Sequence, residues 1–188
     1  SSNVSLSVFK VAGSSVSDGS SVTVANKTGS VVVVATAADP DAVVTVSGAS
    51  GLRTGSDNAV VVTVVAPNGT KKVYTVKVVV LKSSNTSLAS LTVNGVDASS
   101  GGQVTLPART SLAVVKAVAA DPDASVVVSG TALVEGVNTV TVVVTAADGS
   151  TRTVSVPVYV TPLSSNVSLS VFKVAGSSVS DGSSVTVA

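Results

Sequence analysis

The chain has 188 residues and a formal net charge of +1, and it is 45% hydrophobic, 2% aromatic and 11% charged. It contains neither Cys nor His, which excludes disulfides, thiolate or imidazole metal sites and His-dependent catalytic triads. The scarcity of charged and aromatic side chains argues against nucleic-acid binding. No apolar run reaches the roughly 18 residues of a membrane span.

The abundant valine and threonine residues favour strands over helices. Short runs of them alternate with turn residues at a spacing typical of β-sandwiches. We predict strands at 4–11, 20–25, 30–37, 42–47, 58–66 and 72–81. Asn68-Gly69 lies between the last two and predicts a tight hairpin with positive φ angles. In the last strand Tyr74, Val76, Val78 and Val80 alternate with other residues, so they are expected to face the core.

Internal repetition defines the organisation of the chain. Residues 1–25 recur without change at 164–188, and a diverged copy of the whole unit begins at Ser83. The diverged copy aligns Asn58 with Asn138. We therefore predict two all-β sandwich domains in tandem, followed by the first strands of a third unit, with bounds 1–82, 83–163 and 164–188.

The second unit has Pro157 where the first has Lys77. Proline has no N–H for a strand ladder, so we expect this strand to be an edge or to be bulged at Pro157. The junctions, at 81–84 and 161–164, are short and poor in glycine, and Pro162 restricts the second. Short linkers of this kind predict a stiff rod.

Several segments of the second unit together resemble the bacterial cadherin-like β-sandwich repeat. They are LASLTVNG at 88–95, ADPDA at 120–124, VVVSG at 126–130, LVEGVN at 133–138 and TVVVTAADG at 141–149. The resemblance implies an immunoglobulin-like fold in tandem copies within secreted and cell-wall-attached bacterial proteins. It also implies a structural or adhesive stalk and an extracellular, cell-surface location, and it carries over no catalytic residue.

Asp39, Asp41, Asp121 and Asp123 form the recurring Asp-Pro-Asp pairs and are the candidate Ca²⁺ ligands. The competing and favoured interpretation is a turn, in which aspartate caps its own backbone and proline fixes φ. No further acidic side chain lies nearby in the sequence to complete a calcium shell. We predict no cofactor, no metal and no enzymatic activity.

The valine-rich strands place apolar residues on both faces, whereas a solvated sandwich needs one apolar face. We therefore expect outer faces or strand edges to be covered by other copies of the chain, as in a fibre. The candidate assembly segments are the identical stretches Ser1–Ala25 and Ser164–Ala188, with Val8, Phe9, Val11, Val171, Phe172 and Val174 as examples.

Two strands cannot form a stable unit alone, so residues 164–188 need the remainder of a sandwich. One explanation is that the sequence is a window onto a long array with a period of 163 residues, which is favoured because arrays keep their repeats alike. The other is strand exchange, in which the tail completes a second copy.

The leading functional hypothesis is a structural module of an extracellular fibre or surface stalk. The alternative is an adhesin module that binds a glycan or host protein through end loops such as 48–56, although few aromatic residues are available to anchor such a ligand. Copies of the chain itself are the expected partners, and nucleic acid and membrane are not.

Overall fold

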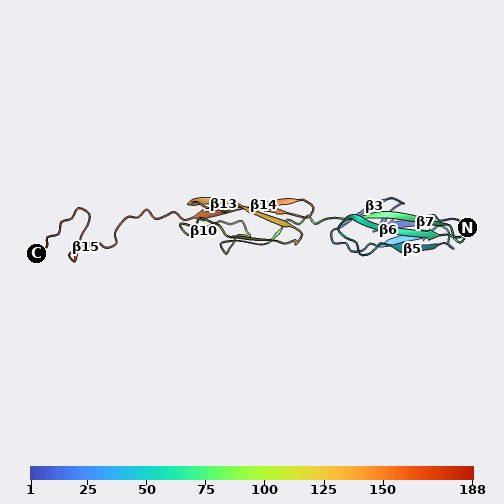
Figure 1. Cartoon of the computed structure of the whole chain (residues 1–188), viewed down its shortest axis with the longest axis horizontal. Coiled ribbons are helices and arrows are strands. Elements are labelled where there is room, and N and C mark those ends of the chain that lie inside the picture. The colour runs from blue at the N-terminus through green and yellow to red at the C-terminus, as the bar shows by residue number, and fades with distance from the viewer.

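The computed structural model describes residues 1–188 and consists of strands and loops without a helix. The predicted all-β class is therefore confirmed. Figure 1 shows two groups of strands placed end to end, followed by an extended tail that leads to the C-terminus. No helix is present that is long and apolar enough to cross a membrane.

The first group of strands forms two sheets. A three-stranded sheet has the order β2-β1-β4, and a four-stranded sheet has the order β3-β7-β6-β5, in which β3 runs parallel to β7. The strands are β1 (Leu6–Val11), β2 (Ser14–Ser15), β3 (Ser21–Val24), β4 (Val33–Ala37), β5 (Val43–Ser47), β6 (Gly55–Val65) and β7 (Lys71–Val80). Each of the six predicted strands is present, and β2 is an additional short one.

The second group repeats this arrangement. Its sheets have the orders β11-β8-β9 and β10-β14-β13-β12, and β10 runs parallel to β14. The strands are β8 (Leu88–Val93), β9 (Val96–Asp97), β10 (Val104–Leu106), β11 (Val115–Ala119), β12 (Ser125–Ser129), β13 (Gly136–Thr145) and β14 (Thr151–Val160). We refer to the two groups as the first and second sandwich.

Each sandwich has its own hydrophobic cluster. In the first, the predicted alternation along β7 is confirmed, because Tyr74, Val76, Val78 and Val80 are all buried. Val60, Val62 and Val64 of β6 join them, and Phe9 and Val11 come from the three-stranded sheet. The second cluster contains the corresponding valines of β13 and β14 with Leu91 and Val93 of β8. The alternating valines of the two long strands thus define the core face.

The hairpin between β6 and β7 differs in detail from the prediction. The Ala66 N–H donates to the Thr70 carbonyl at 2.8 Å, which leaves three residues in the turn. Only Gly69, with φ 88°, adopts a positive φ, whereas Asn68 does not. Asn68 instead accepts a hydrogen bond from the Thr70 N–H through its side-chain oxygen. A three-residue loop with one left-handed residue is a common hairpin connection, and it needs glycine at one position only.

Pro157 does not place β14 at a sheet edge, because β14 lies between β13 and β10. The pairing with β13 also runs through Pro157 and Thr139 without a bulge. In the first sandwich the equivalent Lys77 N–H donates to the Ser20 carbonyl, on the side of β3. In the second sandwich β10 pairs with β14 only from Val158 onwards. The missing N–H therefore shortens the neighbouring strand, while β14 itself remains straight and central.

A tight turn that the sequence reading missed joins β1 to β2. Ala12 and Gly13 both have positive φ angles, 50° and 81°, and the second sandwich has Asn94 and Gly95 in the same conformation. Asn94 also accepts a hydrogen bond from the Val114 N–H at 2.7 Å. Alanine has neither this acceptor nor asparagine's tolerance of the left-handed region, so Ala12 is the less favourable residue here.

We expect Ala12→Asn to stabilise the first sandwich by about 1 kcal/mol, because it relieves the left-handed alanine and offers an acceptor to the backbone. Chemical denaturation followed by segment-resolved hydrogen exchange would measure the change. Asn94→Ala is the matched reverse substitution and should destabilise the second sandwich by a similar amount. Equal stability of Ala12→Asn and the parent chain would contradict the argument.

Candidate assembly surfaces

Residues 1–25 are held in the first sandwich by contacts with both sheets. β1 pairs with β4 along its length, and β3 pairs with β7. The Phe9 ring meets the Tyr74 ring edge to face at a centroid distance of 5.8 Å, and the Tyr74 hydroxyl donates to the Val4 carbonyl at 2.8 Å. The Thr75 N–H donates to Asp18, and the Gly19 N–H donates back to the Thr75 carbonyl. The segment is therefore an integral part of the sandwich.

Residues 164–188 have the same sequence without those partners. Their only strands are β15 (Lys173–Val174) and β16 (Ser177–Ser178), which pair with each other alone. Phe172 is 41% exposed, whereas the identical Phe9 is 9% exposed, and Val174 is 43% exposed where Val11 is fully buried. The tail thus exposes side chains that belong to a core in the first sandwich.

The structure separates the six example residues for assembly into two sets. Phe9 and Val11 lie in the core of their own sandwich, so they are not free to contact another copy, and Val8 is 38% exposed on the opposite face of β1. Val171, Phe172 and Val174 are all exposed in the tail. The tail is therefore the accessible member of the pair of identical segments.

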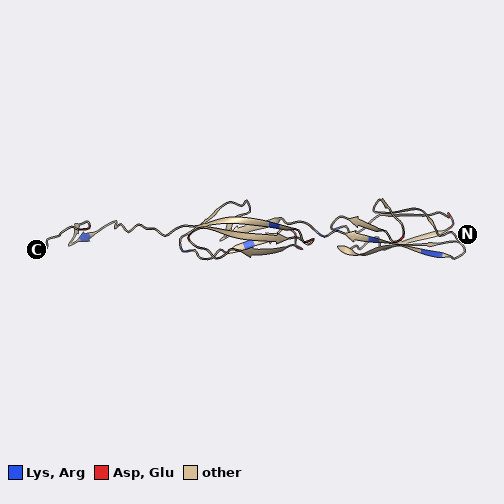
Figure 2. Ribbon diagram, turned by 90° about the horizontal axis from the view of Figure 1, so that it is seen from above, with Lys and Arg blue, Asp and Glu red and all other residues tan.

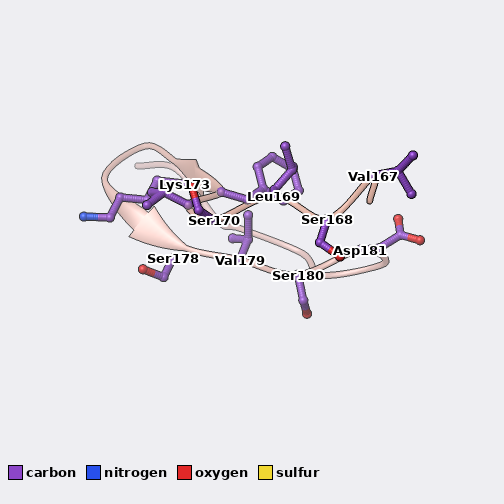
Figure 3. A pocket seen from close by; sticks show the side chains of 11 residues that line it. Val167, Ser168, Leu169, Ser170, Lys173, Ser178, Val179, Ser180 and Asp181 are labelled. Carbon is purple, nitrogen blue, oxygen red and sulfur yellow. The ribbon is translucent and has the colours of Figure 1, made fainter. Parts of the chain in front are cut away.

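The side chains of the tail line an open pocket of about 790 Å³. It lies between the stretch 167–173 and the stretch 178–181, and Figure 3 shows the side chains of Leu169, Ser170 and Val179 around it. Phe172 lines the same pocket. In the first sandwich the equivalent Phe9 meets the ring of Tyr74. The tail offers no aromatic partner of that kind to Phe172.

Exposed apolar side chains lie on the outer face of each three-stranded sheet and on the residues just before β4 and β11. In the first sandwich Val32 and Val34 are 74% and 45% exposed. In the second, Val114 occupies the position of Val32 and is 56% exposed, and Val118 is exposed nearby. Edge strands add Val43 on β5 and Val127 on β12. We call Val32, Val34, Val114 and Val118 the outer valine row.

Charged side chains are few and scattered, as Figure 2 shows. Residues 1–82 carry seven basic and four acidic side chains, whereas residues 83–163 carry three basic and five acidic ones. The two sandwiches therefore have opposite net charges.

The Asp-Pro-Asp segments form turns. The Asp39 carboxylate accepts from the Asp41 N–H at 3.0 Å, and Asp121 accepts from Asp123 at the same distance. In each loop the backbone closes as well, with the N–H three residues on donating to the first aspartate carbonyl. No group of three or more acidic side chains capable of holding a metal ion is present. The arrangement is that of an aspartate-capped turn.

The junction between the sandwiches brings the Asp121 turn close to the end of the first sandwich. Asp121 is 5% exposed. The Ser83 hydroxyl and the Asp123 N–H lower the pKa of its carboxyl group, and the positive charge of Lys27 lowers it further. Ser83 is also fixed by its carbonyl, which accepts from the Asp148 N–H. Lys27 lies in the loop after β3, so the charge that acts on this aspartate turn comes from the preceding sandwich.

A lowered carboxyl pKa stabilises the folded state above the ordinary aspartate pKa, and this contribution is lost as the pH falls through the lower folded value. We therefore expect the stability of the second sandwich to fall below about pH 4. Asp121→Asn should remove part of this pH dependence. Ser83→Ala should reduce it, because the Ser83 hydroxyl contributes most to the lowered pKa of Asp121. Denaturation at a series of pH values would measure both. An unchanged pH profile in Asp121→Asn would refute this assignment.

The end loop that the adhesin alternative invokes contains a second, polar pocket. Its volume is about 430 Å³, and it is lined by Gly51, Arg53, Thr54, Asp57 and Asn58. No hydrophobic side chain lines it. The pocket can form hydrogen bonds but offers no apolar surface on which a sugar ring could stack.

Sequence reasoning missed the contacts that fasten the segments to one another. The alternating pattern of the last strand placed Tyr74 in the core, but it did not predict that the Tyr74 hydroxyl donates a hydrogen bond to the Val4 carbonyl. Lys27 and Ser83 carried no motif, although both act on Asp121. Their equivalents recur 82 residues away, with Arg109 aligned to Lys27 and Ser1 to Ser83. The signal available in the sequence was a basic residue at the same position of both units, Lys27 in the first and Arg109 in the second.

Comparison with protein-family models gives no match, and no curated protein matches the sequence.

Proposed function

We propose that the chain is a structural module of an extracellular fibre or bacterial surface stalk, built from tandem immunoglobulin-like sandwiches of the cadherin-like kind. The outer valine row carries the proposal, because Val32 and Val114 are exposed at the same place in both sandwiches. Single exposed valines are ordinary. Here the exposed valine recurs at one place in both units, and Val34 and Val118 extend the apolar surface in one unit each, which is the kind of surface that neighbouring copies cover.

The mechanism is mechanical. Two sandwiches in line, as in Figure 1, span distance, and their backbone ladders and valine cores resist extension. The short junction supports this role, since Asn26 donates to the Leu81 carbonyl on one side and Asp148 donates to Ser83 on the other. Both ends of the linker are thereby tied to a sandwich. No catalytic role is proposed for any residue.

Electron microscopy of the purified chain at rising concentration tests the proposal. We expect laterally associated rods or filaments, and we expect Val32→Lys with Val114→Lys to reduce them, because lysine on the valine row prevents apolar contact. Thr153→Lys, at an exposed position on β14 in the four-stranded sheet, is the matched surface control and should leave association unchanged. A parent chain that remains a dispersed monomer at every concentration would refute the proposed assembly.

The polar pocket at 51–58 favours a second candidate, an adhesin module that binds a glycan by hydrogen bonds. Arg53 and Asp57 are its charged side chains. A glycan array probed with the chain and with Arg53→Ala would separate the candidates. Binding that depends on Arg53 supports the adhesin, and an array without signal beside visible filaments supports the fibre.

A further inference from the structure

We propose that strand β5 of one copy pairs antiparallel with strand β12 of a second copy, so that the four-stranded sheets of the two copies become one continuous sheet. The proposal rests on the assembling function above, and it names the partner and the contact. It concerns the sides of the molecule, because the long strands run along its length in Figure 1. Units placed in line with these sandwiches would therefore leave both strands uncovered.

β5 and β12 are the outermost strands of their sheets. β5 pairs with β6 alone, and β12 pairs with β13 alone. The Ala146 N–H donates to the Ser150 carbonyl, which fixes one hydrogen-bonded pair at the β13–β14 hairpin. Hydrogen-bonded and non-hydrogen-bonded pairs alternate along an antiparallel ladder. Odd-numbered residues of β13 therefore bond to β12, where Val143 is the partner of Val127.

This alternation identifies the backbone groups that point away from each sheet. Because Val127 bonds to β13, its neighbours Val126 and Val128 direct their N–H and C=O groups outward. The β6–β7 hairpin closes in the same way, so Val44 and Val46 of β5 have the same orientation. No turn or loop hydrogen bond of the backbone uses these groups. Each of the two strands thus presents a row of free donors and acceptors.

β5 and β12 lack the features that usually prevent pairing between sheets. Both have five residues, neither contains a charged residue or a proline, and both pair with their neighbour without a register shift. The other edge strands of the two sandwiches are shorter, or pair with β1 or β8 across a register shift. Val43 and Val127 are 61% and 62% exposed and add apolar surface beside the free backbone groups.

The two strands match each other in antiparallel register. Val44 opposite Val128 and Val46 opposite Val126 form two hydrogen-bonded pairs, and each pair exchanges two N–H···O bonds. All the outward groups of these four residues are then satisfied. Val44, Val126 and Val128 each pack against the core of their own sandwich, so the core faces of the joined sheets lie on the same side.

Charge favours β12 of a second copy over a second β5 as the partner. The first sandwich carries seven basic and four acidic side chains, and the second carries three and five. Pairing β5 with β12 brings opposite net charges together, whereas pairing two equivalent strands brings like charges together. The antiparallel direction also places the two Asp-Pro-Asp turns, which precede these strands, at opposite ends of the contact. Within one chain the sandwiches lie end to end (Figure 1), so its own β5 and β12 do not meet.

Val46→Pro and Val128→Pro test the contact, because each removes one outward N–H and no hydrogen bond inside its sandwich. Both are made in the chain with Val32→Lys and Val114→Lys, in which the outer valine row no longer contributes. We expect this background chain to self-associate in sedimentation equilibrium, and either proline to raise the dissociation constant by about tenfold or more. A mixture of the two proline variants should form a one-to-one complex, since one keeps an intact β12 and the other an intact β5.

Charge at the directly opposed positions tests the register without a proline. Thr45 lies opposite Val127 in the proposed pairing, so Thr45→Lys with Val127→Lys should weaken association several-fold. Thr45→Lys with Val127→Glu places opposite charges there and should restore it. The matched controls are Val73→Lys and Thr153→Lys, which lie in the same cross-strand rows on the central strands β7 and β14. They should leave the dissociation constant unchanged.

Three results would overturn the proposal. One is a Val46→Pro chain that self-associates as strongly as the background chain, which would indicate pairing of β12 with β12 or another contact. The second is an equal effect of Val127→Lys and Thr153→Lys. The third is a background chain that stays monomeric while the parent chain forms filaments, which would leave the fibre function intact and refute only the pairing of β5 with β12. A parent chain that stays monomeric at every concentration would refute both.

Discussion

Gly130→Ala is expected to unfold the second sandwich, with a loss of more than about 4 kcal/mol. Gly130 follows the edge strand β12 with a φ of 74°, and a Cβ placed there would overlap the carbonyl oxygen of Thr139. That oxygen belongs to the central strand β13, so it cannot move without breaking the sheet. A sandwich of this size has a total stability of about 4–12 kcal/mol, which makes the loss comparable to the whole. Hydrogen exchange along β13 and β14 would measure it.

The matched control is Gly101→Ala in the same sandwich. Gly101 has the same φ of 74°, but a Cβ there would meet nothing within 4 Å. It should cost only the strain of a left-handed alanine, about 1–2 kcal/mol. The first sandwich offers the same comparison. A Cβ on Gly48 would overlap the Ala59 carbonyl oxygen, whereas a Cβ on Gly51 would meet nothing within 4 Å. Equal effects of Gly130→Ala and Gly101→Ala would show that close approach is not the cause.

Asn58→Asp should destabilise the first sandwich by about 3 kcal/mol. The Asn58 amide nitrogen donates to the Arg53 carbonyl at 2.7 Å and to the Val78 carbonyl at 3.1 Å, while its oxygen accepts from the Arg53 N–H. Aspartate keeps the acceptor but places a negative oxygen against two carbonyls. Asn138 makes the same contacts in the second sandwich, with Val134 and Val158. Asn138→Asp should therefore have a similar effect there.

Asn68→Asp is the internal control for this prediction. Asn68 uses only its side-chain oxygen, which accepts from the Thr70 N–H, and aspartate retains that acceptor. The second sandwich already has Asp148 at this place, where it accepts from Ser150. Denaturation should therefore show a change within about 0.5 kcal/mol. A large loss in Asn68→Asp would show that charge in a loop, rather than the lost amide donor, is responsible.

Strands and core were predictable because they depend on local pattern. The alternation of Tyr74, Val76, Val78 and Val80 has a period of two, which is a property of any strand with one buried face. The turn at Ala12 was not predictable in the same way, because alanine seldom has a positive φ and only the aligned Asn94 hints at it. Pro157 was misread because a sheet position is defined by both neighbours, and the sequence does not say where β10 begins.

For the candidate assembly residues, too, the sequence predicted one part and the structure decided the other. The sequence identified 1–25 and 164–188 as interchangeable, yet only the structure shows that Phe9 is buried while Phe172 is exposed. Identical sequences differ here because burial depends on partners, and residues 26–82 serve the first segment only. The aspartate pairs were correctly placed in turns, but the effect of Lys27 on Asp121 crosses between sandwiches and has no local signal.

The sequence alone determined the all-β class, the 82-residue offset and the duplication of 25 residues, since these follow from composition, periodicity and repetition. The tertiary structure decided how residues 1–25 pack into the first sandwich, which valines face outward and which glycines meet a neighbouring backbone. Those properties depend on contacts between residues far apart in the chain. Propensity and pattern act over a few neighbouring residues, whereas burial and close approach arise only when the sheets have packed.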